Sequence, residues 1–158
     1  MFTNEVTSME QHGFIQDMLD VKVLILFVMD PYFYIPECHF RQVNGIFAEA
    51  VISQGSSERK VDANGNGRLD AVCNIIKQYF DISFELSTYE EHALSHGSSS
   101  KAMAYVGITY QGSMFWGVGT DEDIIKASIN ALVVAVNHLL DTLKSTTVKD
   151  ERYVAMLN

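Results

Sequence analysis

Two Gly-x-Gly sequences, Gly65-Asn66-Gly67 and Gly117-Val118-Gly119, each precede a segment whose apolar residues have helical spacing. Backbone N–H groups that are free at the start of a helix bind anions, either a phosphate or a carboxylate. Neither sequence has the lysine of a Walker motif or the third glycine of a dinucleotide fingerprint, so a nucleotide is weakly supported. A small anionic metabolite, such as an amino acid, fits this chemistry.

The segment from Asp62 to Cys73 carries part of the spacing of a calcium-binding loop. Oxygen donors stand at positions one, three, five and nine, and a glycine stands at position six. Position twelve is Cys73, where the loop needs a bidentate glutamate, and the residues before Asp62 have a strand pattern instead of a helical one. We therefore expect a turn from a strand into a helix and no calcium site.

His92 and His96 are four residues apart, a spacing that places two imidazoles on one face of a helix for a metal ion. They lie near the end of an expected strand, where this spacing separates them, so we expect a structural or pocket-lining role for them. The two cysteines, Cys38 and Cys73, form neither a zinc motif nor a disulfide framework. Because no Gly-x-Ser-x-Gly elbow is present either, the sequence predicts no catalytic residue, no metal and no cofactor. Its chemistry favours binding over catalysis.

Composition limits the partners and the compartment. The chain has 158 residues, 47% of them hydrophobic, and a formal net charge of −9, which disfavours nucleic acid. The apolar run 21–29 is too short for a membrane helix, and the N-terminus lacks the basic start of a signal peptide. We expect a cytoplasmic protein with no membrane partner. The length also excludes a complete (β/α)₈ barrel, which takes about 250 residues.

The elements that must position these residues form a repeated order. Alternating and β-branched patterns, hairpin signals such as Asn44-Gly45, and helical spacing predict three strands and a helix, twice. The expected strands are 32–35 with 39–43, 46–52, 58–63, 82–89, 102–110 and 113–116, and the expected helices are 68–80 and 121–143.

The two Gly-x-Gly sequences begin 52 residues apart, at Gly65 and Gly117, and this offset defines the expected repeat. The pattern predicts an α+β fold of two pseudo-symmetric βββα repeats, with the helices packed on antiparallel sheets. Pro31 and Pro36 mark the start of the main domain. We expect residues 1–30 to be an N-terminal extension, 31–143 the domain and 144–158 a C-terminal tail.

Three segments, in order, resemble a known family. The first is Gly65-Asn66-Gly67-Arg68-Leu69-Asp70-Ala71, the second runs from Tyr89-Glu90-Glu91-His92-Ala93 to Val106, and the third begins at Trp116-Gly117-Val118-Gly119. They are similar to the glycine turn, the Tyr-x-Glu-His-Ala/Ser segment and the Trp-Gly-Val-Gly signature of the C-terminal regulatory (allosteric dimerisation) domain of 2-isopropylmalate synthase and related citramalate synthases. The resemblance covers about residues 34–140.

This resemblance implies a non-catalytic domain for feedback control in branched-chain amino-acid biosynthesis. In that family two chains pair through the domain, and leucine, or isoleucine for citramalate synthase, binds near the interface. The implied partners are thus leucine or another branched-chain amino acid, a second copy in a homodimer, and a synthase catalytic subunit that could bind in trans. The implied effector-binding residues are Gly65, Gly67, Leu69, Asp70, Tyr89, Ala93, Ser100 and Ile124.

Two departures keep alternatives open. Arg68 stands where the family usually has proline, which adds a charge near the implied pocket. The catalytic barrel has no counterpart in this sequence, which we expect to be a free-standing regulatory subunit or an excised domain. A structural dimerisation module that has lost its effector is the main alternative, and Arg68 favours it. A small enzyme is the weakest, because the sequence assembles no nucleophile with a base.

Overall fold

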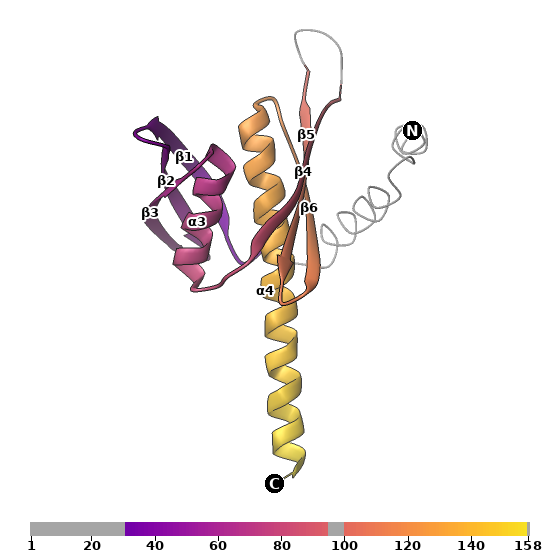
Figure 1. Ribbon diagram of the computed structural model, residues 1–158. Coiled ribbons are helices and arrows are strands. Elements are labelled where there is room, and N and C mark those ends of the chain that lie inside the picture. The colour runs from indigo at the N-terminus through magenta and orange to yellow at the C-terminus, as the bar shows by residue number, and fades with distance from the viewer. Residues whose placement is uncertain (1–30, 95–99, 158) are drawn as a thin grey trace.

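The computed structural model describes residues 31–94 and 100–157, which form two three-stranded antiparallel sheets, each followed by a helix (Figure 1). This architecture confirms the predicted α+β fold of two βββα repeats. The elements are β1 (Tyr34–Gln42), β2 (Ile46–Gln54), β3 (Ser57–Gly65), α3 (Arg68–Phe80), β4 (Glu85–Ala93), β5 (Ala102–Tyr110), β6 (Ser113–Asp121) and α4 (Ile124–Leu157).

Tight turns join β1 to β2, β2 to β3 and β5 to β6. Asn44 and Gly45 both have positive φ, at 50° and 110°, in the short loop between Gln42 and Ile46, which pair with each other. Gln111 and Gly112 have φ of 47° and 80° in the two-residue hairpin turn between Tyr110 and Ser113, as a turn of this type requires. The strand order is β1-β2-β3 in one sheet and β4-β5-β6 in the other, so each strand pairs with its neighbour along the chain.

The repeat has a different offset from the one that the glycines suggested. Strands β2 and β5, strands β3 and β6, and helices α3 and α4 each begin 56 residues apart. The first helical hydrogen bonds agree, since the N–H of Ala71 donates to Gly67 and the N–H of Ala127 donates to Asp123. The predicted offset of 52 residues is therefore wrong, because the structural counterpart of Gly65 is Asp121.

Gly117 and Gly119 are not a turn, as the sequence suggested, but lie inside β6. A Cβ atom at Gly117 would collide with the carbonyl oxygen of Ala131, and one at Gly119 would collide with that of Ala127. Both glycines thus let α4 approach β6 closely. Helix α4 makes most of its sheet contacts with β6, fewer with β5 and few with β4.

Helix α3 begins and ends where the apolar spacing predicted, whereas α4 begins three residues later than expected and continues to Leu157 instead of ending near Leu143. Figure 1 shows its C-terminal part extending beyond the sheets. The stretch Ile124–Thr147 is long and apolar enough to cross a membrane by length and composition alone. Because 56% of an 18-residue apolar window within it is buried in the protein, it also has the pattern of a core helix.

The buried amide of Asn137 in α4 holds the start of the described chain. Its Oδ1 accepts the N–H groups of Tyr32 and Phe33 at 2.7 and 3.3 Å, and its Nδ2 donates to the carbonyl of Phe33 at 3.1 Å. The Phe33 side chain is fully buried and lies edge-on to the ring of Phe80. The chain therefore enters the domain at the seam between the two repeats.

Candidate functional site

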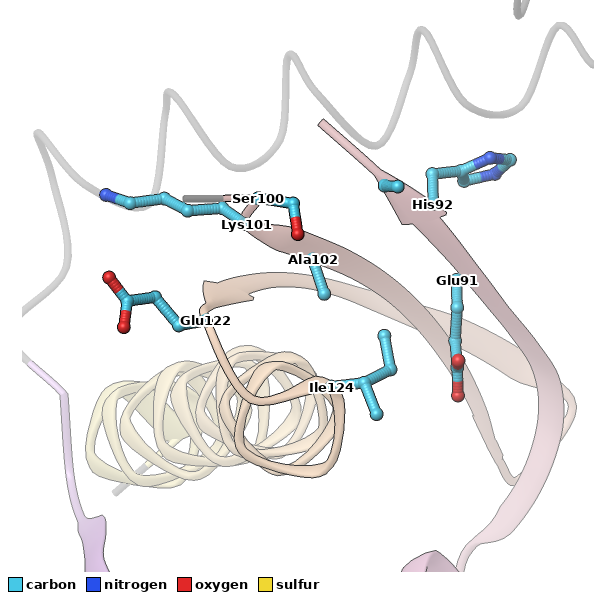
Figure 2. A pocket seen from close by; sticks show the side chains of 8 residues that line it. Glu91, His92, Ser100, Lys101, Ala102, Glu122 and Ile124 are labelled. Atoms are coloured by element: carbon cyan, nitrogen blue, oxygen red, sulfur yellow. The ribbon is translucent and has the colours of Figure 1, made fainter. Parts of the chain in front are cut away.

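A pocket of about 280 Å³ lies between the N-terminus of α4 and the neighbouring ends of β4 and β5 (Figure 2). Its walls come from three separate segments of the second repeat. The lining residues are Glu91, His92, Ala93, Ser100, Lys101, Ala102, Glu122 and Ile124.

The register of the second sheet explains why this hollow exists. Glu91 pairs with Ala104, which pairs in turn with Gly119, so these three residues form one row across the sheet. This row faces α4, since Gly119 is in close contact with the helix. Because Gly119 has no side chain, α4 lies close to β6, while β4 at the opposite edge of the sheet has few contacts with the helix. The space left over at the start of α4 is the pocket.

The acidic residues at the start of α4 fix its first turn. The Oδ1 of Asp123 accepts the N–H of Ile125 at 2.9 Å, which is the bond of a helix N-cap. The Oδ1 of Asp121 accepts the N–H of Asp123 at the same distance. These bonds hold Ile124, the first residue of the helix, on the wall of the pocket, where 39% of its surface is exposed.

A chain of hydroxyl groups links the edge strand to this turn. The hydroxyl oxygens of Tyr89 and Ser128 are 2.7 Å apart, and the Ser128 hydroxyl also bonds to the carbonyl of Ile124 at 2.7 Å. Tyr89 lies on the same face of β4 as Glu91 and Ala93, because alternate residues of a strand share a face. Tyr89 therefore joins β4 to the start of α4 beside the pocket.

The pocket combines an apolar wall with charges of both signs. Ala93, Ala102 and Ile124 supply the apolar surface. Figure 2 shows Lys101 and Glu122 on one side of the hollow and Glu91 on the other, with Ala102 and Ile124 between them. Such a site can bind a small molecule that carries both charges and an aliphatic group.

The implied effector-binding residues fall into two groups in the structure. Ala93, Ser100 and Ile124 line the pocket, and Tyr89 lies beside it. The other four, Gly65, Gly67, Leu69 and Asp70, lie where β3 meets α3, and none of them lines this pocket. In Figure 1 both helices begin at the same end of the molecule, the upper end in that view.

The glycine turn before α3 is closed by its own residues. The carboxylate of Asp70 accepts the N–H of Asn66 at 2.8 Å, so this acid already has a structural partner. A Cβ at Gly65 would collide with the backbone of Ala71, whereas one at Gly67 would meet nothing within 4 Å. The guanidinium of Arg68 lies 5.8 Å from the centre of the Phe40 ring, on β1.

His92 lines the pocket, in agreement with one of the two roles that the sequence offered for it, but sequence reasoning missed four of the lining residues: Glu91, Lys101, Ala102 and Glu122. One of them could have been found, because Glu91 lies between Tyr89 and Ala93 at the spacing of a shared strand face. Lys101 and Glu122 carried no such signal, since their place depends on the pairing of β5 with β6 and on the start of α4.

The described residues contain no group of three or more metal-binding side chains. Asp62 and Asn64 lie on β3, so this part of the predicted turn is a strand. His92 lies 3.5 Å from Glu90 and edge-on to Tyr105, while His96 is outside the described residues. Burial raises the pKa of Cys38 to about 11 and that of Cys73 to about 12, so neither thiol is a ready nucleophile.

Comparison with known proteins identifies the fold family. Residues 33–140 match the family described as the LeuA allosteric (dimerisation) domain. The chain is 42% identical over 84 residues to 2-isopropylmalate synthase of Helicobacter hepaticus, which covers 53% of this chain and 15% of that protein. It is 44% identical over 96 residues to the enzyme of the same name from Clostridium acetobutylicum, covering 60% of this chain and 17% of that protein.

The match is thus confined to a small part of each relative. The enzyme of the same name from Rhizobium meliloti is 37% identical over 94 residues, which are 60% of this chain and 17% of that protein. The chain spans less than a fifth of the length of these relatives. Since the family match covers more than half of the chain and the two βββα repeats agree with the predicted fold, this chain belongs to the family of LeuA allosteric (dimerisation) domains.

Proposed function

We propose that this domain senses a branched-chain amino acid, with leucine as the first candidate, and transmits feedback inhibition to a 2-isopropylmalate synthase. The observation that carries the proposal is the pocket at the start of α4, with its apolar wall and its charges of both signs. The family and the names of the relatives support a regulatory role beside such an enzyme. The catalytic reaction itself belongs to the relatives and is not assigned to these residues.

The pocket suits a molecule of this size. Its volume of about 280 Å³ is at the lower end of the range for small-molecule sites, roughly 300–1,000 Å³. A branched aliphatic side chain against Ala93, Ala102 and Ile124 would gain about 1.5–3 kcal/mol if fully buried. Lys101 and the hydroxyl of Ser100 offer partners for a carboxylate, and a glutamate on the opposite side of the pocket offers a partner for an ammonium group.

Regulation would follow from linkage. An effector shifts an equilibrium only when it binds one state more tightly than the other. A ligand between β4 and Ile124 would favour the state in which the edge strand and α4 are held together, as the Tyr89–Ser128 contact already holds them. Helix α4 is also hydrogen-bonded to the start of the domain, because the N–H of Tyr32 donates to Asn137. A change in the position of α4 on ligand binding would therefore reach this segment.

We further propose that two copies pair through this domain and that the pair acts on synthase catalytic subunits, whether fused or bound in trans, in the cytoplasm. The family description as a dimerisation domain supports the pairing. The glycine turn before α3 opens at the same end of the molecule as the pocket, so a second copy could present this turn to it (Figure 1). The free thiols of Cys38 and Cys73 suit a reducing compartment.

Thermal unfolding with L-leucine, L-isoleucine and L-valine tests the sensing role, and size-exclusion chromatography with light scattering tests the pairing. We expect dimers and a saturable rise in melting temperature, since a ligand at 100 times its Kd adds about 2.7 kcal/mol of stability. Dimers without a response to any of the three at millimolar concentration would instead identify a dimerisation module that has lost its effector. Arg68 is the residue that favours that second outcome.

A further inference from the structure

We infer that Glu91 is the counter-ion for the α-ammonium group of the ligand, so that the pocket selects an amino acid over the corresponding 2-oxo acid. This inference rests on the proposed sensing function and names the group that would give it selectivity. It concerns a residue of this chain that sequence reasoning did not single out. The place of Glu91 in the sheet and its lack of another partner among the described residues support this role.

Glu91 is an acid on the helix-facing side of its sheet. It pairs with Ala104, which is fully buried beneath α4, and it shares that face with Tyr89 and Ala93. Glu91 itself is exposed, because β4 is the edge strand of the sheet. From this position its carboxylate can reach the open end of the pocket, and Figure 2 shows it beside Ile124.

The carboxylate of Glu91 is free to bind a ligand. Among residues 31–94 and 100–157 it has no ion-pair partner and no side-chain hydrogen bond, whereas Glu90 on the opposite face lies 3.5 Å from His92. An ammonium group that lies between this carboxylate and the apolar wall would form a charge-assisted hydrogen bond. Such a bond in a partly enclosed site is stronger than one in bulk water.

The second acid of the pocket has a different explanation. Glu122 stands between Asp121 and Asp123 just before α4, where negative charge is favoured by the helix dipole. In Figure 2 it lies on the same side as Lys101, away from Glu91. Lys101 therefore marks the end of the pocket where a carboxylate would lie, and Glu91 marks the end for the ammonium group.

The consequence is a sensor that reads the aminated compound. A 2-oxo acid with the same side chain keeps the carboxylate and the aliphatic group but cannot donate to Glu91. Its binding would leave a carboxylate unpaired beside the ligand, which penalises the wrong molecule more than a missing methyl group does. The domain would then ignore the oxo-acid precursor of its effector.

The test compares L-leucine with 4-methyl-2-oxopentanoate by calorimetric titration of the full chain and of its Glu91→Gln variant. The unmodified chain should bind leucine at least about tenfold more tightly than the oxo acid, and Glu91→Gln should weaken leucine binding about 10- to 100-fold while changing oxo-acid binding little. Glu91→Asp should retain part of the preference. Glu85→Gln, on the same strand outside the pocket, is the matched control and should bind leucine as the unmodified chain does.

The outcomes separate the two proposals. If the unmodified chain binds leucine and Glu91→Gln binds it equally well, or if leucine and the oxo acid bind equally, the role of Glu91 is overturned and the sensing function stands. If the unmodified chain binds no branched-chain amino acid, the sensing function falls and the role of Glu91 falls with it. Circular dichroism of the unmodified chain and of each variant shows whether every protein compared is folded.

Discussion

The hydroxyl oxygen of Tyr89 lies 2.7 Å from that of Ser128, and this contact joins edge strand β4 to α4 across 39 residues of sequence. It stands beside the pocket, and Ser128 continues the link to the carbonyl of Ile124 at 2.7 Å. The contact matters because α4 packs closely on β6 but touches β4 little. This side-chain bond thus joins β4 to α4 beside the pocket.

Removing the Tyr89 hydroxyl should loosen this edge. We expect Tyr89→Phe to lower the free energy of unfolding by about 1 kcal/mol and to weaken the thermal response to leucine, because the two walls of the pocket are no longer joined. A double-mutant cycle with Ser128→Ala in urea unfolding measures the coupling. Tyr110→Phe is the control and should change stability by less than about 0.5 kcal/mol, because the Tyr110 hydroxyl accepts a long bond of 3.3 Å from the neighbouring, exposed Gln111. Additive effects of the two substitutions would argue against the link.

Substitution by alanine should affect stability strongly at one of the two glycines before α3 and little at the other. Gly65→Ala brings a Cβ into the backbone of Ala71, so we expect a loss of about 1–3 kcal/mol or more in chemical unfolding. Gly67→Ala meets open space at an extended φ of −144°, and we expect stability to change by less than about 0.5 kcal/mol. Equal effects at both positions would contradict the described packing.

Gly67 also offers a test of the glycine turn in effector binding. Because its side-chain position is open, Gly67→Asp can add a charge with little effect on the fold of one copy. If the turn of one copy faces the pocket of another, this charge should weaken the melting-temperature response to leucine. Gly67→Ala provides the neutral comparison. An unchanged response in Gly67→Asp would separate the turn from the effector site.

The amide of Asn137 should be a main determinant of stability. Asn137→Ala leaves the N–H groups of Tyr32 and Phe33 without their acceptor in a buried place, which we expect to cost about 2–4 kcal/mol. Asn137→Asp keeps the acceptor but places a buried carboxylate oxygen against the carbonyls of Phe33 and Val133, so its loss should be at least as large and should decrease at low pH, where the acid is protonated and can donate. Asn130→Ala, at an exposed position of the same helix, is the control for urea unfolding. A cost at Asn137 no larger than that at Asn130 would show that the entry segment is held by other contacts.

His138 should make the free energy of unfolding depend on pH. Burial, opposed in part by the charge of Asp141, holds the pKa of His138 below its ordinary value of 6.5, and its Nδ1 has no hydrogen-bond partner within the described chain. As the pH falls below 6.5 the unfolded chain takes up the proton first, so the folded state loses stability between 6.5 and the lower native pKa. Above 6.5 the contribution is fully present.

Urea unfolding between about pH 8 and pH 5 measures this effect as a difference between the unmodified chain and His138→Gln. The unmodified chain should lose more stability on acidification than the variant, because the glutamine side chain does not titrate. Parallel pH curves for the two proteins would show that His138 is solvated like an ordinary histidine.

Local patterns predicted most of the fold. The spacing of Leu69, Val72 and Ile76 placed α3 correctly, and Asn44-Gly45 marked a real hairpin. The repeat offset failed because two Gly-x-Gly sequences look alike but serve different purposes. Gly65 lets α3 pass close to the end of β3, while Gly117 and Gly119 let α4 lie on β6, and only the three-dimensional packing distinguishes these roles.

The candidate site was harder to predict than the fold. Strand alternation could have added Glu91 to Tyr89 and Ala93, since all three share a face. Lys101 and Glu122 could not be found, because they come together where the start of β5 pairs with the end of β6, at Ala102 and Asp121. The division of the implied residues between two helix starts likewise depends on tertiary arrangement, which no local pattern records.

Calorimetric titration of L-leucine into the unmodified chain tests the central claim most directly. The sensing role requires saturable heat with one leucine bound per pocket, and binding that is lost when Ile124→Asp places a charge on the apolar wall. Ile124 is 39% exposed, so this variant should remain folded. Saturable binding to the unmodified chain and none to Ile124→Asp is the expected result. No heat from leucine, isoleucine or valine at millimolar concentration, or equal binding by Ile124→Asp, would contradict the claim.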